Sequence, residues 1–563
     1  MYLLKKTPRA HGPNEPFKHE NHPRPVTRRE LMGAGFLSGG AMVMAPAWLG
    51  ALLRTGNAEA AVLNSDLTAQ QKECALQPPA NGGGTLGSTG PVPFITIDLA
   101  GGANLMGSEA IAGMAGSPTN FISSAGFSKL GVPGNMVPTT SAFIDMSLGL
   151  PFHADSAILR GIKSKAPATA LAKVNGVVIP AISQNDTNSN PLNAMYLVAK
   201  AVNQIATPAP VYGQYATLVG TNATTSGGNS AAPAAYVDST LQPTRIASSA
   251  DNTALVGSSA GGAASQITVD VQQAQTTIST GTTFAPGNDP KAVVPATFSG
   301  SQVAMNTFIK ATSDPAGATM GGAATTADLA LKEQLRCAYL KNAFTAVNSK
   351  GPDSVNPDKD TLIVGGATPI FTATDYQDGD VKKTAAVMKL VINGYAGAGT
   401  IALGGFDYHS GNRADGETKN QKAGMLIGAI IAYAELANTP VMINIISDGS
   451  LTSTGNADNS TAGRGKLGWQ GDSQQVAASI ILVYSPKGRP AATINQIGSL
   501  NADGTVNATS SPGANAPNLV TQIVALNWMA LNGVNSLFQT QFPMQGLGAA
   551  TAQAALTAFT KIT

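Results

Sequence analysis

The chain has 563 residues, of which only 12% are charged, and its formal net charge is +2. This length allows one large domain with insertions, or two or more smaller domains. So small a net charge gives no basic field that would attract a phosphate backbone, so we expect no nucleic-acid partner.

The N-terminus carries the pattern of a twin-arginine export signal. Residues 1–29 are rich in Lys and Arg, and Arg28-Arg29 lie just before an uncharged stretch from Leu31 to Leu53. Ala58-Glu59-Ala60 supplies a small-x-small cleavage site. We therefore expect residues 1–60 to be a signal peptide that engages the Tat export machinery and leaves a periplasmic or secreted protein. The uncharged stretch is also long enough for an uncleaved membrane anchor, and this alternative stays open.

Cleavage after Ala60 would reverse the charge of the protein. Residues 1–60 hold eight of the 34 basic and four of the 32 acidic residues, so the mature chain has 26 basic and 28 acidic residues and a net charge of −2. We expect no membrane span in this mature chain. Its two cysteines, Cys74 and Cys337, either form a disulfide in an oxidising compartment or remain unpaired, since their spacing does not decide between these outcomes.

Only two histidines remain after cleavage. Three of the five lie in the leader, which leaves His153 and His409. A metal site that needs three imidazoles from one chain is therefore excluded, and with it most zinc-hydrolase arrangements.

The mature chain begins with a predicted surface segment over residues 61–92, and residues 93–563 are predicted to form one α/β domain. Pro93–Leu99 reads as a buried strand of a parallel sheet. The glycines at 101 and 102 follow it, but no nucleotide-binding fingerprint is present.

The loop over 183–191 is rich in side-chain oxygens, which fits either a cluster of Asx turns or a site for a hard cation. From about residue 205 to about 325, small polar residues predict a long, partly ordered insertion.

The second half of the chain alternates between helical and strand patterns. Helices are predicted over Ala327–Val347, Asp380–Asn393, Thr418–Ala437 and Pro517–Asn532, and strands over Asp360–Gly365, Thr400–Leu403, Pro440–Ile446 and Ala477–Tyr484. This alternation predicts a mostly parallel central sheet with helices on both faces.

The predicted strand Thr400–Leu403 is followed by Phe406-Asp407-Tyr408-His409. A carboxylate and an imidazole two residues apart at the end of a strand form half of a metal or acid–base site, because ligands collect at the carboxyl edge of such sheets. The alternative is a polar turn. Asn104 and Asp448 also follow predicted strands, whereas Asp472 precedes one, so we expect these side chains to converge at one edge.

Four motifs resemble those of one protein family. Leu99-Ala100-Gly101-Gly102-Ala103-Asn104-Leu105-Met106 is similar to its Leu-x-Gly-Gly-x-Asp-x-Leu, and Phe406-Asp407-Tyr408-His409 to its Phe-Asp-Thr-His. Ser447-Asp448-Gly449-Ser450 is similar to Ser-Glu-Phe-Gly, and Gly471-Asp472-Ser473-Gln474 to Thr-Asp-His-Gly. In this order, the chain resembles twin-arginine-exported bacterial proteins of the alkaline phosphatase/sulfatase superfamily, some of which carry the label of general secretion pathway proteins. The resemblance, over roughly residues 93–200 and 330–535, implies an alkaline-phosphatase-like fold with an insertion.

The resemblance also implies a metal site, but with two departures. In the superfamily, Asp and His side chains hold two metals, and a Ser or Thr attacks a phosphate or sulfate. Asn104 stands where the family has an acid, and Ser473 where it has a histidine, so a charge and a strong ligand for first-row metals are lost. The residues that remain for one divalent metal ion are Asp407, His409, Asp448 and Asp472, with Asn104, His153 and Ser473 as additional candidates.

These observations favour an exported protein with a degenerate or single-metal site. A metal-dependent hydrolase of phosphate or sulfate esters is the first alternative, for which Ser108 and Ser189 are candidate nucleophiles without an assigned role. A surface or envelope-assembly protein, in which the insertion does the work, is the second.

Overall fold

The computed structural model describes residues 90–139, 142–183, 190–205, 216–238, 241–256, 352–409 and 413–562. Several expectations fall outside these ranges: the leader, residues 61–89, both cysteines, Ser189, the helix over 327–347 and most of the insertion. No helix within the described ranges is both long and apolar enough to cross a membrane.

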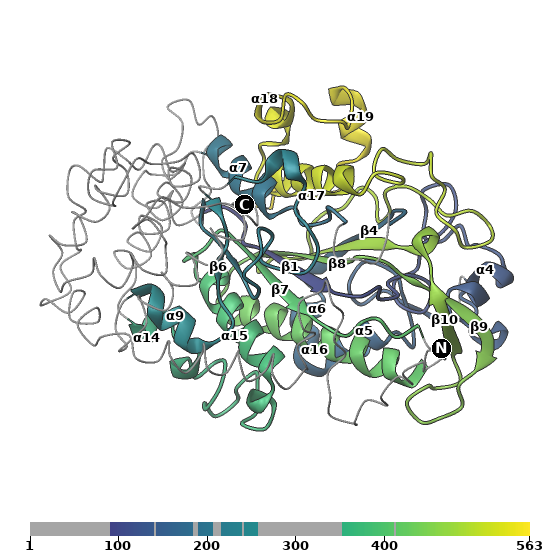
Figure 1. The fold of residues 1–563 in the computed structure, drawn as a ribbon, viewed down its shortest axis with the longest axis horizontal. Coiled ribbons are helices and arrows are strands. Elements are labelled where there is room, and N and C mark those ends of the chain that lie inside the picture. The colour runs from purple at the N-terminus through teal and green to yellow at the C-terminus, as the bar shows by residue number, and fades with distance from the viewer. Residues whose placement is uncertain are drawn as a thin grey trace, which may run out of the picture.

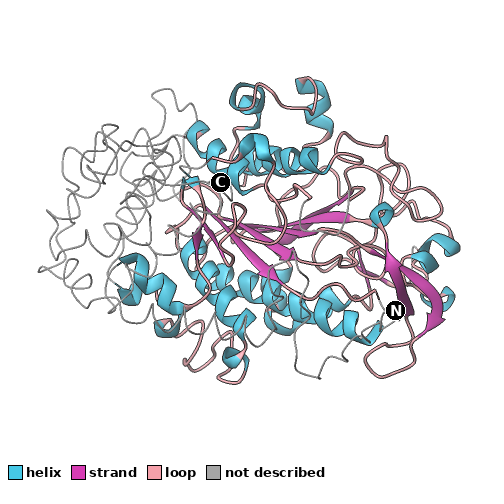
Figure 2. Cartoon of the chain, viewed as in Figure 1, coloured by secondary structure: helices cyan, strands magenta, loops and turns pink. Residues whose placement is uncertain are grey.

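A seven-stranded sheet runs through the middle of the molecule, and helices lie on both sides of it (Figures 1 and 2). Its strands, in spatial order, are β4 (Val174–Pro180), β11 (Ala478–Tyr484), β8 (Val441–Ser447), β1 (Phe94–Leu99), β7 (Ala398–Leu403), β5 (Leu218–Gly220) and β6 (Thr244–Arg245). Neighbouring strands are parallel except at β11, which is antiparallel to both β8 and β4. The predicted α/β class with a mostly parallel sheet is confirmed.

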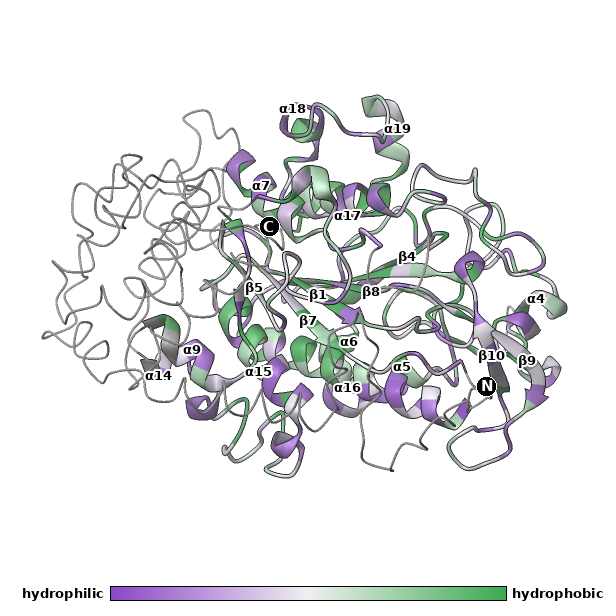
Figure 3. Cartoon of the chain, viewed as in Figure 1, coloured by the Kyte–Doolittle hydropathy of each residue, from purple (hydrophilic) through white to green (hydrophobic). Residues whose placement is uncertain are grey.

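The sheet has a separate apolar core on each face. Alternate residues of β1 divide between them: Ile95, Ile97 and Leu99 pack with helices α5, α15 and α16, whereas Phe94 packs with α7 and α17. These helices are α5 (Ala157–Lys165), α7 (Met195–Ala201), α15 (Gly379–Ile392), α16 (Arg413–Leu436) and α17 (Pro517–Leu531). In Figure 3 the strands between the two helical layers are mostly hydrophobic, as expected for strands that are buried on both faces.

Local sequence explains where two of these helices begin. The side chain of Asp378 caps α15 by accepting from the amides of Asp380 and Val381. Pro517 occupies the first turn of α17, where its missing N–H leaves no hydrogen bond unmade. Both helices were predicted within a residue or two of these bounds.

Helices α5 and α16 approach each other closely because glycines line their contact. A Cβ built on Gly424 would lie 2.0 Å from the carbonyl oxygen of Ile158, and one on Gly161 would lie 2.1 Å from that of Gln421. Only glycine fits at such separations, so these two residues fix the spacing of the two helices.

The remaining elements are short. The helices are α4 (Ser124–Lys129), α6 (Ala168–Leu171), α9 (Ser249–Val256), α14 (Pro352–Val355), α18 (Phe538–Gln541) and α19 (Ala550–Ala555). Two small antiparallel sheets pair β2 (Ile144–Asp145) with β3 (Phe152–His153), and β9 (Leu451–Ala457) with β10 (Leu467–Asp472).

The structure corrects two expectations. Asp360–Gly365 is a turn rather than a strand, because the Asp360 carbonyl accepts from the amides of Ile363 and Val364 and its carboxylate accepts from that of Leu362. Helix α16 begins at Arg413 rather than Thr418. Within the range predicted as a partly ordered insertion, the structure describes β5, β6 and α9, and the two strands extend the central sheet at one edge.

Candidate metal centre

Three parallel strands end together at one edge of the sheet. In the register of the ladder, Leu99 of β1 lies opposite Leu403 of β7 and Ser447 of β8. The segments that follow these strands therefore leave the sheet side by side. This edge carries the glycine pair after β1, the motif that contains Asp407, and Asp448.

The segment after β7 folds back onto the segment after β1. The amide of Phe406 donates to the carbonyl of Ala100 at 3.0 Å. Gly101 has a φ of +116°, and a Cβ built on it would lie 2.6 Å from the amide nitrogen of Asp407. A side chain at position 101 would be strained by its backbone and would also displace this segment, so Gly101 lets Asp407 reach its place.

Asp407, His409 and Asp472 form the candidate metal centre. The Nδ1 atom of His409 contacts a carboxylate oxygen of Asp407 and lies 3.2 Å from Oδ1 of Asp472. One ligand atom from each residue lies within 4.8 Å of the other two. The side chains are accessible, with exposed fractions of 57% for Asp407 and 40% for each of the others.

This set of donors fits a divalent cation. Two carboxylates and one imidazole supply hard and borderline ligands of the kind that suit zinc, manganese or ferrous iron. The carboxylates would also offset the charge of the ion. Because the three atoms already lie close together, a cation could contact all of them without a change in the fold.

The β9–β10 hairpin delivers Asp472 to this edge. Strand β9 starts at Leu451, directly after the end of β8, and Asp472 at the end of β10 pairs with Leu451. The chain thus leaves the edge in β9 and returns to it in β10. Trp469 of β10 is 1% exposed and stacks on the guanidinium of Arg413 at 4.5 Å from the ring centroid, which holds the hairpin against α16.

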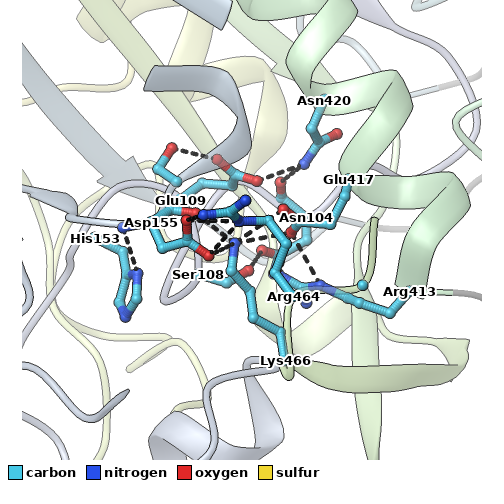
Figure 4. Close-up of polar contacts among 12 residues, drawn as sticks. Asn104, Ser108, Glu109, His153, Asp155, Arg413, Glu417, Asn420, Arg464 and Lys466 are labelled. Carbon is cyan, nitrogen blue, oxygen red and sulfur yellow. Dashed lines mark hydrogen bonds and ion pairs between the residues drawn. The ribbon is translucent and has the colours of Figure 1, made fainter. Parts of the chain in front are cut away.

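A buried ionic cluster lies at the same junction (Figure 4). Glu417 of α16 accepts from Arg413 Nη2 at 2.7 Å and from Lys466 Nζ at 2.9 Å through Oε1. Its Oε2 atom accepts from Arg160 Nη2 of α5 at 2.8 Å. Glu417 therefore joins α5, α16 and the base of β10 in one network.

The charges in this cluster are set by burial and by one another. Burial opposes ionisation of Glu417, but Arg413 and Lys466 outweigh it and hold the pKa of Glu417 below its ordinary value. Nearby Glu109 has a raised pKa, first because it is buried and second because the Glu417 carboxylate repels its charge. Burial lowers the pKa of Lys466, which is fully enclosed. Glu417 is thus the main counter-charge for two buried cations.

Asp448 lies at the same edge but outside the group of three. It is fully buried, and its Oδ1 atom accepts from the amide of Gly101 at 2.7 Å. It also faces Asp98 of β1, whose pKa is raised to about 6 by burial, with a smaller contribution from Asp448. The hydrogen bond from the Gly101 amide to Asp448 therefore stabilises the turn after β1.

Asn104 and Ser108 are buried beneath the site. The Ser108 hydroxyl donates to Asn104 Oδ1 at 2.9 Å, and both residues have no exposed surface. A serine enclosed in this way is not placed to attack a solute. The Asn104 Nδ2 group has no hydrogen-bond partner among the described residues.

The other two candidates have separate surroundings. His153 is buried, and its ring stacks on Phe143. Its Nε2 donates to the carbonyl of Met136 at 3.0 Å, and its Nδ1 accepts from the amide of Asp155. With both ring nitrogens used and its pKa lowered by burial, it is a neutral structural residue. Ser473 adjoins Asp472, and its amide donates to the carbonyl of Ser450 at 2.8 Å.

Sequence reasoning missed the residues that support the site. Arg413 and Glu417 are four residues apart, which is the spacing of a helical ion pair, but a helix that starts at Thr418 leaves both outside it. Trp469 gives no signal on its own, because the hairpin around it was not predicted.

Comparisons of the chain with models of known protein families, with curated proteins and with solved structures find no match. Function is therefore argued from the residues and geometry of this chain.

Proposed function

We propose that this protein binds one divalent metal ion through Asp407, His409 and Asp472. The observation that carries the proposal is the approach of three ligand atoms to within 4.8 Å of one another. They come from two segments that are far apart in the sequence, and Gly101 and Trp469 hold those segments in place. Zinc, manganese and ferrous iron are the candidates because the ligands are oxygen and nitrogen atoms.

A single ion is favoured over a pair. The carboxylate of Asp448 binds the amide of Gly101, and the amide oxygen of Asn104 is bonded to Ser108. These are the positions where the sequence resemblance leads one to look for further ligands. We infer that the chain is an exported relative of the alkaline phosphatase/sulfatase superfamily with a reduced site, which leaves the cell interior by the twin-arginine route and works in the periplasm or outside the cell.

The proposal is tested by titrating the metal-free exported protein with Zn²⁺ and Mn²⁺ in a calorimeter. We expect one ion per chain, and Asp472→Ala should weaken binding at least tenfold because one of three ligands is lost. Asp503→Asn is the control, since Asp503 is also an exposed aspartate, at 57% against 40% for Asp472, but pairs with Lys129 elsewhere on the surface. Equal affinities for the wild type and Asp472→Ala would refute the proposed site.

Hydrolysis of a phosphate or sulfate ester is the second candidate. The exposure of all three ligand side chains favours it, because a solute can reach the site directly. When bound there, a divalent ion would polarise the ester and offset developing negative charge. Metal-loaded protein that turns over neither generic phosphate nor generic sulfate esters would argue against this function while leaving metal binding intact.

A further inference from the structure

Tyr408 lies between two of the metal ligands in the sequence but faces the opposite way. It is 2% exposed, whereas the side chains of Asp407 and His409 are 57% and 40% exposed. The segment therefore turns its two ligands outward and its aromatic ring into the protein. A buried residue placed between two ligands is well situated to fix both.

The Tyr408 hydroxyl is fully used in hydrogen bonds. It accepts from the amide of Asn104 at 2.9 Å and donates to Oδ1 of Asn420 at 3.0 Å. Asn420, on α16, in turn donates from Nδ2 to Glu109 at 2.9 Å, and Figure 4 shows Asn420 directed toward that carboxyl group. The hydroxyl thus ties the ligand segment to the turn after β1 and to helix α16.

The Tyr408 ring also contacts the strand that carries the third ligand. Its centroid lies 6.3 Å from that of Trp469, which precedes Asp472 on β10. Gly416 makes room for this pair, because a Cβ built there would lie 2.9 Å from the Tyr408 ring and 3.0 Å from Trp469 Nε1. The Tyr408 side chain therefore links its own segment, which supplies two ligands, to the strand that supplies the third.

We propose that Tyr408 is a positioning residue of the metal centre, and that its hydroxyl holds Asp407 and His409 in the geometry that receives the ion. The inference rests on the proposed function. Loss of the hydroxyl would leave the Asn104 amide and Asn420 Oδ1 without their partner, and the segment would relax away from its present position. Groups that orient metal ligands typically change metal affinity 10–100-fold when they are lost.

The test compares Tyr408→Phe with Tyr433→Phe in the full exported protein. Both substitutions remove a buried tyrosine hydroxyl that donates to a side chain, but Tyr433 bonds Asp360 at 2.7 Å near the other end of α16. Zn²⁺ affinity is measured by competition with a chromogenic chelator, and the visible spectrum of the Co²⁺-loaded protein reports ligand geometry. Both readouts are taken on folded protein, so a purely structural loss of stability leaves them unchanged.

We expect Tyr408→Phe to weaken Zn²⁺ binding by about tenfold or more and to alter the Co²⁺ spectrum, while Tyr433→Phe matches the wild type. Asn420→Ala removes the acceptor of the Tyr408 hydroxyl without changing the ligand segment, so it should also weaken Zn²⁺ binding. This variant serves as the test if Tyr408→Phe does not fold. Wild-type affinity and spectrum in the folded Tyr408 and Asn420 variants would overturn the inference and leave the metal site standing. A wild-type protein that binds no Zn²⁺ or Co²⁺ would refute the proposed function and this inference together.

Discussion

Removal of the Glu417 charge is expected to destabilise the fold strongly, because this carboxylate is buried against buried cations. Glu417 is 3% exposed, and Arg413 and Lys466, which are 1% and 0% exposed, bond to its Oε1 atom. Glu417→Gln keeps the shape of the side chain but removes the negative charge. Its amide group would also turn donor hydrogens toward Lys466 or Arg160, which are themselves donors.

The expected loss follows from the burial of these cations. Breaking a buried ion pair by neutralising one partner typically costs about 3–5 kcal/mol, because the remaining charge is left uncompensated. Glu109 would offset part of this loss, since its pKa is raised in part by Glu417 and falls when that charge is removed. We therefore expect Glu417→Gln to lower the free energy of unfolding by about 3 kcal/mol, the low end of this range.

The assay is urea unfolding at pH 7, followed by the fluorescence of the buried Trp469 and Trp528. Glu435→Gln is the matched control, because Glu435 lies on the same helix and pairs with Lys173 at 2.8 Å, but its side chain is 22% exposed. We expect this control to lose about 1 kcal/mol or less. Equal losses for the two variants would refute the view that Glu417 is the central counter-charge of the cluster.

Two further predictions concern packing and pH. Gly424→Ala should lower the free energy of unfolding by about 1–3 kcal/mol, because its Cβ would lie 2.0 Å from the Ile158 carbonyl oxygen. Gly379→Ala, with open space around it, should be neutral or stabilising in the same urea unfolding assay. Burial raises the pKa of Asp98 from 3.8 to about 6, so the folded state retains a proton that the unfolded chain has released. The free energy of unfolding should therefore decrease between about pH 4 and pH 6, by at most about 3 kcal/mol, and Asp98→Asn should remove this slope. An unchanged slope in Asp98→Asn would assign the pH dependence to other groups.

The sequence predicts the central elements because their patterns are local. Strand β1 is a run of buried residues bounded by proline and glycine, whereas α15 begins at a capping aspartate and α17 begins with a proline in its first turn. The turn at Asp360 carries a strand-like pattern because Leu362, Ile363 and Val364 form a short apolar run, whereas the hydrogen bond from the Leu362 amide to the Asp360 carboxylate leaves no mark in that pattern. Residue type alone therefore does not distinguish a short buried strand from an apolar turn such as 360–365.

The site is less predictable because its members meet only in three dimensions. The spacing of Asp407 and His409 marks them as a pair, but only the β9–β10 hairpin brings Asp472 to His409. Asp448 also follows a strand, immediately after β8, yet its carboxylate contacts the turn after β1 instead. The direction of each side chain depends on loop geometry, which the sequence pattern does not specify.

Metal content of the purified protein tests the central claim most directly. The full chain is expressed, purified without chelators, and analysed by elemental mass spectrometry beside Asp472→Ala and the Asp503→Asn control. We predict close to one divalent transition-metal ion per chain in the wild type and the control, and far less in Asp472→Ala. A wild-type protein that carries no such ion and takes up none after incubation with Zn²⁺ or Mn²⁺ would contradict the account.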